Sequence, residues 1–207
     1  DDLVRWIKSL SAKRGLIAAW IALAAAVVFA AGQYNAKEKY TAYVSYRLDA
    51  DMRRFVERLE IIDQAYADVL EEGTISSRQR NLFMLHEDLA NIIRDYRELA
   101  VRLGLRDESF RYDQSTVNAM KIVRYFNVWE DEETVELDPP TRERIAVMRE
   151  FVGTWLAAVD RDVPSYRVND DSWLRLLDAI ETNTIAFLAG RRIDALDDLW
   201  LDRTEIR

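Results

Sequence analysis

The feature that most constrains this chain is the stretch of residues 15–36, GLIAAWIALAAAVVFAAGQYNA, because it contains no charged side chain. A helix that crosses a bilayer needs about 20 mainly apolar residues, and 22 residues in a helix rise about 33 Å. A signal-peptide core is usually shorter, roughly 7–15 residues. The stretch therefore predicts one transmembrane helix that serves as a signal-anchor, with a cleaved signal peptide and a buried core helix as the alternatives.

Residues 1–14 have the pattern of a short basic amphipathic helix. Apolar residues fall on one helical face and basic residues on another: Leu3, Trp6, Ile7 and Leu10 against Arg5 and Lys8. Such a helix suits the headgroup region of a membrane, and a frayed chain terminus is the alternative. The residues predicted to form the membrane anchor are Trp6, Leu16, Trp20, Ile21 and Phe29.

Basic residues flank the apolar stretch on both sides. Four precede it (Arg5, Lys8, Lys13 and Arg14), and three follow soon after (Lys37, Lys39 and Arg47). Basic residues favour the cytoplasmic side, so this small excess predicts a cytoplasmic N-terminus and a large domain outside.

The charge balance of the remaining chain limits its partners. The formal net charge is −8 in total; residues 1–14 carry +2, which leaves −10 for the rest. An acidic domain argues against nucleic acid as a partner, since binding it needs a basic face. The chain has no cysteine, which excludes disulfides, thiolate metal sites and thiol nucleophiles.

Two long segments repeat apolar residues in alternating steps of three and four, the spacing of a helical seam. The first segment ends before Gly73, and Ser76 with Gln79 predicts a capping box that starts the second. The second is expected to be one helix as far as Leu103. Because the connection is short, the pair is expected to form a long antiparallel hairpin. The seams, which later helices or a partner must cover, include Leu48, Met52, Phe55, Leu59 and Ile62, then Leu82, Leu85, Leu89, Ile92 and Leu99.

Further helices are expected over residues 109–129, from Pro139 to about residue 159, and from about Trp173 to an interruption at Gly190. A short one is expected around residues 193–200. Asp138 is the expected N-cap of the second of these. The predicted fold is all-α: a transmembrane helix that continues into the hairpin, packed with three or four further helices as a bundle. The predicted organisation is residues 1–14 juxtamembrane, 15–36 transmembrane and 37–207 an acidic helical domain.

Residues that could carry chemistry are few. His86 is the single histidine, and HEDLA lacks the second histidine that a zinc-protease helix requires four residues on. The acidic stretches at 131–138 and 160–171 lack the spacing of a calcium loop, so solvated loops are expected there. Trp129, Trp155, Trp173 and Trp200 fall on apolar faces and indicate either core or an aromatic pocket. We expect no catalytic residue, metal or cofactor, and no enzyme activity.

The sequence therefore predicts a single-pass membrane protein whose helical domain binds other proteins, as a scaffold or accessory subunit of a membrane or cell-envelope complex. Expected partners are the lipid bilayer and either another membrane or envelope protein or a second copy, through coiled-coil-like helix contacts. The alternative is an extracytoplasmic ligand-binding bundle of a sensory protein, by analogy of fold alone.

Overall fold

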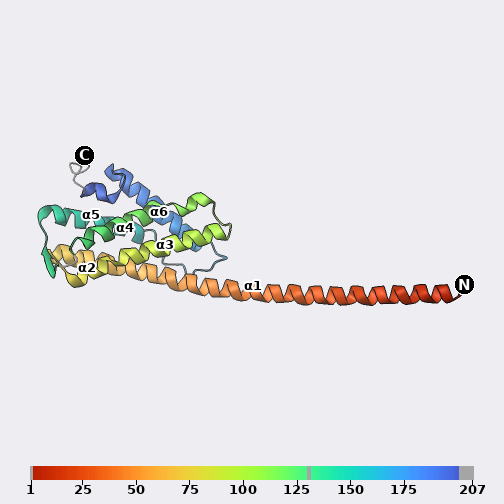
Figure 1. Ribbon diagram of the computed structural model, residues 1–207. Coiled ribbons are helices and arrows are strands. Elements are labelled where there is room, and N and C mark those ends of the chain that lie inside the picture. The colour runs from red at the N-terminus through yellow and green to blue at the C-terminus, as the bar shows by residue number, and fades with distance from the viewer. Residues whose placement is uncertain (1, 130–131, 201–207) are drawn as a thin grey trace. The chain divides into compact units, whose positions relative to one another are not determined.

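The computed structural model describes residues 2–129 and 132–200, without the side chains of residues 2–22, 24, 25 and 31. The chain divides into two compact units, Asp1–Tyr46 and Arg47–Arg207. Figure 1 shows the second unit as a bundle of helices, with the C-terminal half of α1 along one side. Helices dominate both units, which confirms the all-α prediction.

Helix α1 runs without interruption from Asp2 to Glu72. It contains no proline, so each backbone N–H after the first turn can bond within the helix. The helix ends at Gly73, whose φ of 74° is accessible to glycine at little cost. The N–H of Gly73 donates to Val69 O at 2.9 Å, and the predicted end of this helix is confirmed.

The first unit consists of the N-terminal part of α1. Most of its apolar side chains are exposed where the structure describes them, with Val28 72% and Phe29 69% accessible, whereas Val44 is half-buried. A search limited to the described residues finds no helix with both the length and the apolar character to cross a membrane.

The predicted antiparallel hairpin is present in the second unit. As the residue number increases along α1, the residue number of its contact on the returning arm decreases, which is the pattern of antiparallel packing. The pairs are Asp51 with Tyr96, Arg58 with Asp88, and Tyr66 with Phe83. The returning arm begins with α2 (Ser77–Phe83), and the predicted capping box of Ser76 and Gln79 is confirmed.

The returning arm is two helices and not the single helix that was predicted. Helix α2 stops at Phe83 and α3 runs over Leu85–Arg102, with Met84 between them. The carbonyl of Phe83 accepts a hydrogen bond from Nδ1 of His86 at 2.7 Å, while the N–H of Glu87 bonds to Met84 O. A side chain thus replaces a backbone donor at this point, which interrupts the helical ladder.

A two-stranded antiparallel ladder lies where only loops were predicted. Strand β1 (Thr74–Ser76) pairs with β2 (Thr134–Glu136), and Ile75 lies opposite Val135. Ile75 is fully buried, so this ladder closes the end of the bundle where α1 stops. The predicted acidic loop is therefore partly a strand.

The remaining helices fill the other side of the bundle. The helix expected over 109–129 is a 3-10 turn, η1 (Glu108–Arg111), followed by α4 (Gln114–Asn127), which Asp113 caps. Helix α5 (Pro139–Leu156) starts at Asp138 as predicted. Helix α6 (Ser172–Arg191) passes through Gly190, contrary to expectation, and Arg192 takes the left-handed conformation that ends it. In place of the short helix predicted around residues 193–200, the structure has a single 3-10 turn, η2 (Leu196–Leu199).

The core lies between α1 and these later helices and is rich in aromatic rings. Phe83 stacks on Tyr66 and on Phe126 with centroids 4.3 Å apart in each pair, and Phe55 stacks on Trp155 at 6.2 Å. Trp155 and Trp173 are fully buried and Trp129 and Trp200 partly so. All four tryptophans are therefore core or core-edge residues.

Candidate functional site

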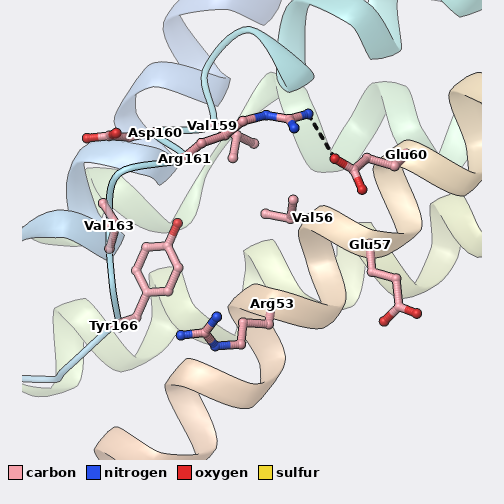
Figure 2. A pocket seen from close by; sticks show the side chains of 9 residues that line it. All are labelled: Arg53, Val56, Glu57, Glu60, Val159, Asp160, Arg161, Val163 and Tyr166. Atoms are coloured by element: carbon pink, nitrogen blue, oxygen red, sulfur yellow. Dashed lines mark hydrogen bonds and ion pairs between the residues drawn. The ribbon is translucent and has the colours of Figure 1, made fainter.

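A hollow with polar walls lies between α1 and the segment that joins α5 to α6. It has a volume of about 380 Å³, close to the lower limit of typical small-molecule sites. Figure 2 shows its lining side chains on these two segments: Arg53, Val56, Glu57 and Glu60 from α1, and Val159, Asp160, Arg161, Val163 and Tyr166 from the joining segment.

Local sequence explains why the joining segment leaves the helix and folds back. Helix α5 ends at Leu156, and the Asp160 carboxylate accepts a hydrogen bond from the N–H of Asp162 at 3.0 Å, which forms a turn. Pro164 lacks a backbone donor, so helix cannot resume there. Residues 157–171 therefore run across the bundle and approach α1.

Two residues of α1 hold one end of this segment. Arg53 donates from Nε to Asp49 at 2.9 Å and from Nη2 to the carbonyl of Pro164 at 2.6 Å. The other carboxylate oxygen of Asp49 accepts the backbone N–H of Tyr166 at 2.9 Å. Burial tends to raise the pKa of Asp49, but the bonds from Arg53 and Tyr166 outweigh it and hold that pKa below its usual value. Asp49 is therefore ionised at neutral pH.

The other end of the segment is held more loosely. Nη2 of Arg161 lies 2.8 Å from Oε1 of Glu60, and both side chains are largely exposed. An exposed pair of this kind contributes at most about 1 kcal/mol. One end of the segment is thus fixed by a charged network and the other by one solvated ion pair.

The interior of the hollow is apolar with one phenol. Val56, Val159 and Val163 supply its apolar lining, and the hydroxyl of Tyr166 points into it (Figure 2). Burial, followed by the nearby charge of Asp160, raises the pKa of Tyr166. The phenol is therefore protonated at neutral pH and can donate a hydrogen bond.

The groups that line the hollow can hydrogen-bond and pair with a ligand. The polar groups are two arginines, three carboxylates and a neutral phenol, with neither a histidine base nor an activated nucleophile. Across the described residues, no group of three or more histidine, cysteine, aspartate or glutamate side chains is placed to hold a metal ion.

The predicted seam residues lie mostly inside the bundle. Leu48, Met52, Phe55, Leu59 and Ile62 are at most 1% exposed. On the returning arm Leu89 is buried, whereas Leu82, Leu85, Ile92 and Leu99 are half-buried at the edge of the core. The sequence predicted that either later helices or a partner protein would cover these seams. In the structure, the later helices cover the seam of α1.

The buried face of α3 is displaced from the predicted seam. It comprises His86, Leu89, Ala90, Ile93, Tyr96, Arg97 and Ala100. This is a broad stripe typical of a helix that packs against several neighbours. It shares Leu89 and Tyr96 with the predicted repeat of Leu82, Leu85, Leu89, Ile92, Tyr96, Leu99 and Leu103.

The predicted membrane-anchor residues are only partly described. The side chains of Trp6, Leu16, Trp20 and Ile21 lie outside the described residues, and Phe29 is exposed. Their role in a membrane stays a prediction.

His86 occupies the core and not the hollow. It is fully buried beside Tyr66, with ring centroids 5.9 Å apart, and its Nε2 has no hydrogen-bond partner in the described chain. Burial lowers its pKa from 6.5 to about 4, against a smaller opposing effect of the bond to Phe83. His86 is therefore a neutral core residue at pH 7.

Sequence reasoning did not identify the residues of the hollow. Pro164 marked a loop, but nothing in the sequence indicates that this loop returns to Arg53 across 111 positions. Comparison with other proteins adds no assignment, since no protein-family model, no curated protein and no solved structure matches the chain significantly.

Proposed function

We propose that this protein is a single-pass membrane-anchored helical interaction protein, an accessory subunit of a membrane or cell-envelope complex without catalytic activity of its own. The observation that carries the proposal is the exposed apolar surface of α1 before the bundle. Leu23, Val27, Val28 and Phe29 are each more than half exposed. A contiguous surface of this kind needs a cover.

Lipid is the cover that fits this surface best. The exposed residues belong to the uncharged stretch 15–36, whose length matches the hydrocarbon thickness of a bilayer. Tyr34 lies near the C-terminal end of the stretch and Tyr40 follows it. Both are exposed, and tyrosine is enriched where a helix leaves the hydrocarbon. The basic residues before the stretch favour a cytoplasmic N-terminus and an external bundle.

The interaction role rests on the bundle. Its core is filled by aromatic and aliphatic side chains. The half-buried residues Leu82, Leu85, Ile92 and Leu99 form an apolar edge on α2 and α3 that a partner helix or a second copy can cover.

Membrane anchoring is tested with the full chain expressed in cells. Arginine at Ala26 and Phe29 together adds about 6 kcal/mol to the free energy of insertion, since each charge near the centre of a span costs about 3 kcal/mol. We expect the wild type to stay in the membrane pellet after carbonate washing and the double variant to leave it. Ala42→Arg, an exposed position beyond the stretch, is the control and should stay in the pellet. Release of the wild type would overturn the proposal.

The side on which the bundle lies is tested by labelling. The chain lacks cysteine, so Asn169→Cys, at an exposed position of the joining segment, introduces one reporter. We expect a membrane-impermeant maleimide to label intact cells. Labelling only after lysis would place the bundle in the cytoplasm.

A second candidate function is ligand sensing by an external bundle, and the hollow beside Tyr166 favours it. Its volume is that of a small-molecule site, and its lining combines three valines with polar side chains that can orient a ligand. Specific binding of a small molecule there would favour a sensor over a scaffold.

A further inference from the structure

The donors around the hollow have unused capacity. Tyr166 makes a hydrogen bond only through its backbone N–H, Arg53 only through Nε and Nη2, and Arg161 only through Nη2, as far as the described chain shows. The Tyr166 hydroxyl, Nη1 of Arg53, and Nε and Nη1 of Arg161 therefore remain available for a ligand. All belong to side chains that line the hollow.

The hydrogen-bond acceptors that line the hollow are less available than the donors to a ligand inside it. In Figure 2 the carboxylates of Glu57 and Asp160 point away from the centre of the hollow, and the carboxylate of Glu60 is paired with Arg161. A ligand inside the hollow thus meets open donors, while the nearest acceptor is already satisfied. This arrangement favours a negatively charged group.

Two further features of the hollow limit the chemical class of the ligand. Three valines are part of the lining, so part of the ligand must be apolar for its burial to be favourable. The charged lining residues, two arginines against three acids, sum to −1. That balance opposes anions in proportion to their charge, a phosphate monoester more than a carboxylate. A single negative charge placed at the donors therefore meets the smaller repulsion.

We infer that the hollow between α1 and residues 157–171 binds a small organic monocarboxylate, with its apolar body on Val56, Val159 and Val163 and its carboxylate at Tyr166, Arg53 and Arg161. The inference rests on the second candidate function and specifies its ligand. Tyr166, which stays protonated at neutral pH, and the arginines supply charge-assisted hydrogen bonds, the stronger kind.

The test uses the full chain in lipid nanodiscs and two probes that differ mainly in charge. Binding of 4-fluorobenzoate and of 4-fluorobenzylamine is followed by fluorine NMR of the probe. We expect the carboxylate to bind with a Kd of about 1 mM or tighter and the amine to bind at least tenfold more weakly, as about one charge-assisted hydrogen bond implies. Equal binding of the two, or preference for the amine, would overturn the inference.

Variants locate the site. Tyr166→Phe removes one hydroxyl and keeps the ring, and Arg161→Gln removes a charge whose present partner is the exposed Glu60. Each should weaken carboxylate binding about tenfold. The matched control is Arg102→Gln, which removes an exposed arginine paired with Glu98 on α3 and should leave affinity unchanged. Circular dichroism checks that each variant is folded.

The outcomes separate this inference from the anchoring proposal. Carboxylate binding that neither variant weakens would place the ligand elsewhere and refute the site. Absence of binding by a wild-type chain that still resists carbonate extraction would refute the ligand inference and leave membrane anchoring intact.

Discussion

Helix α1 contains two apolar regions that have opposite surroundings. Leu23 and residues 26–30 expose their apolar side chains, whereas the seam from Leu48 to Val69 is at most 1% exposed. The first region is apolar on all faces and uncharged, and the second alternates a narrow apolar stripe with arginines and acids. Periodicity, and not apolar content alone, thus separates a helix that packs on its own chain from one that needs an external cover.

The largest expected difference between the regions comes from phenylalanine truncation. Phe55→Ala leaves a cavity against Trp155 and should lower the free energy of unfolding by about 3–5 kcal/mol. Phe29→Ala should change it by less than about 0.5 kcal/mol, because Phe29 is exposed. Denaturant unfolding in one detergent, followed by tryptophan fluorescence, measures both. A large effect of Phe29→Ala would contradict the distinction between the two regions.

The second largest effect is expected from acid, which should lower the free energy of unfolding of the bundle. Because folding lowers the pKa of His86 to about 4 from an unfolded value of about 6.5, the unfolded chain binds more protons between these values. Stability is therefore full above pH 6.5 and decreases as pH falls, by roughly 3 kcal/mol at pH 4. Urea unfolding across this range measures the decrease.

The control for acid sensitivity is His86→Leu, which should flatten the pH dependence between 6.5 and 4.5. Carboxylates with lowered pKa, such as Asp138 and Asp170, add a loss at still lower pH that both proteins share. An unchanged slope in the variant would exclude His86 as the cause.

Glycine substitution should distinguish the regions by a smaller amount. Gly73→Ala places a side chain at φ 74°, where the nearest atom is 3.8 Å away, so backbone strain alone lowers stability, by about 1–2 kcal/mol. Gly32→Ala lies within the helix with open space around it and should not lower the stability of the bundle. Melting temperatures of the two variants provide the comparison, and equal shifts would argue against the strain at Gly73.

Much of the bundle follows from local sequence signals. The end of α1 at Gly73, the capping box at Ser76 and the start of α5 at Asp138 each depend on residues within one turn. The seam of α1 was also identified correctly as apolar, because 3.5-residue spacing repeats over seven positions.

The features that were missed depend on contacts between distant residues or on side-chain competition. The break at Met84 arises because the side chain of His86 donates a hydrogen bond to the carbonyl of Phe83. Helix propensities of single residues do not indicate such a bond. The ladder between Thr74–Ser76 and Thr134–Glu136 is too short to show a period. The hollow depends on the hydrogen bond from Arg53 to the carbonyl of Pro164. These residues are distant in sequence and come together only when the bundle has folded.

The ladder between β1 and β2 also bears on the order of folding. Its strands are separated by the whole of α2, α3 and α4, so closing it early would cost the entropy of a long loop. We expect α3 and α4 to pack first and the ladder to close afterwards, as contacts distant in sequence generally form late. In pulse-labelled refolding, the amides of the two strands should gain protection after those of α3; simultaneous protection would contradict this order.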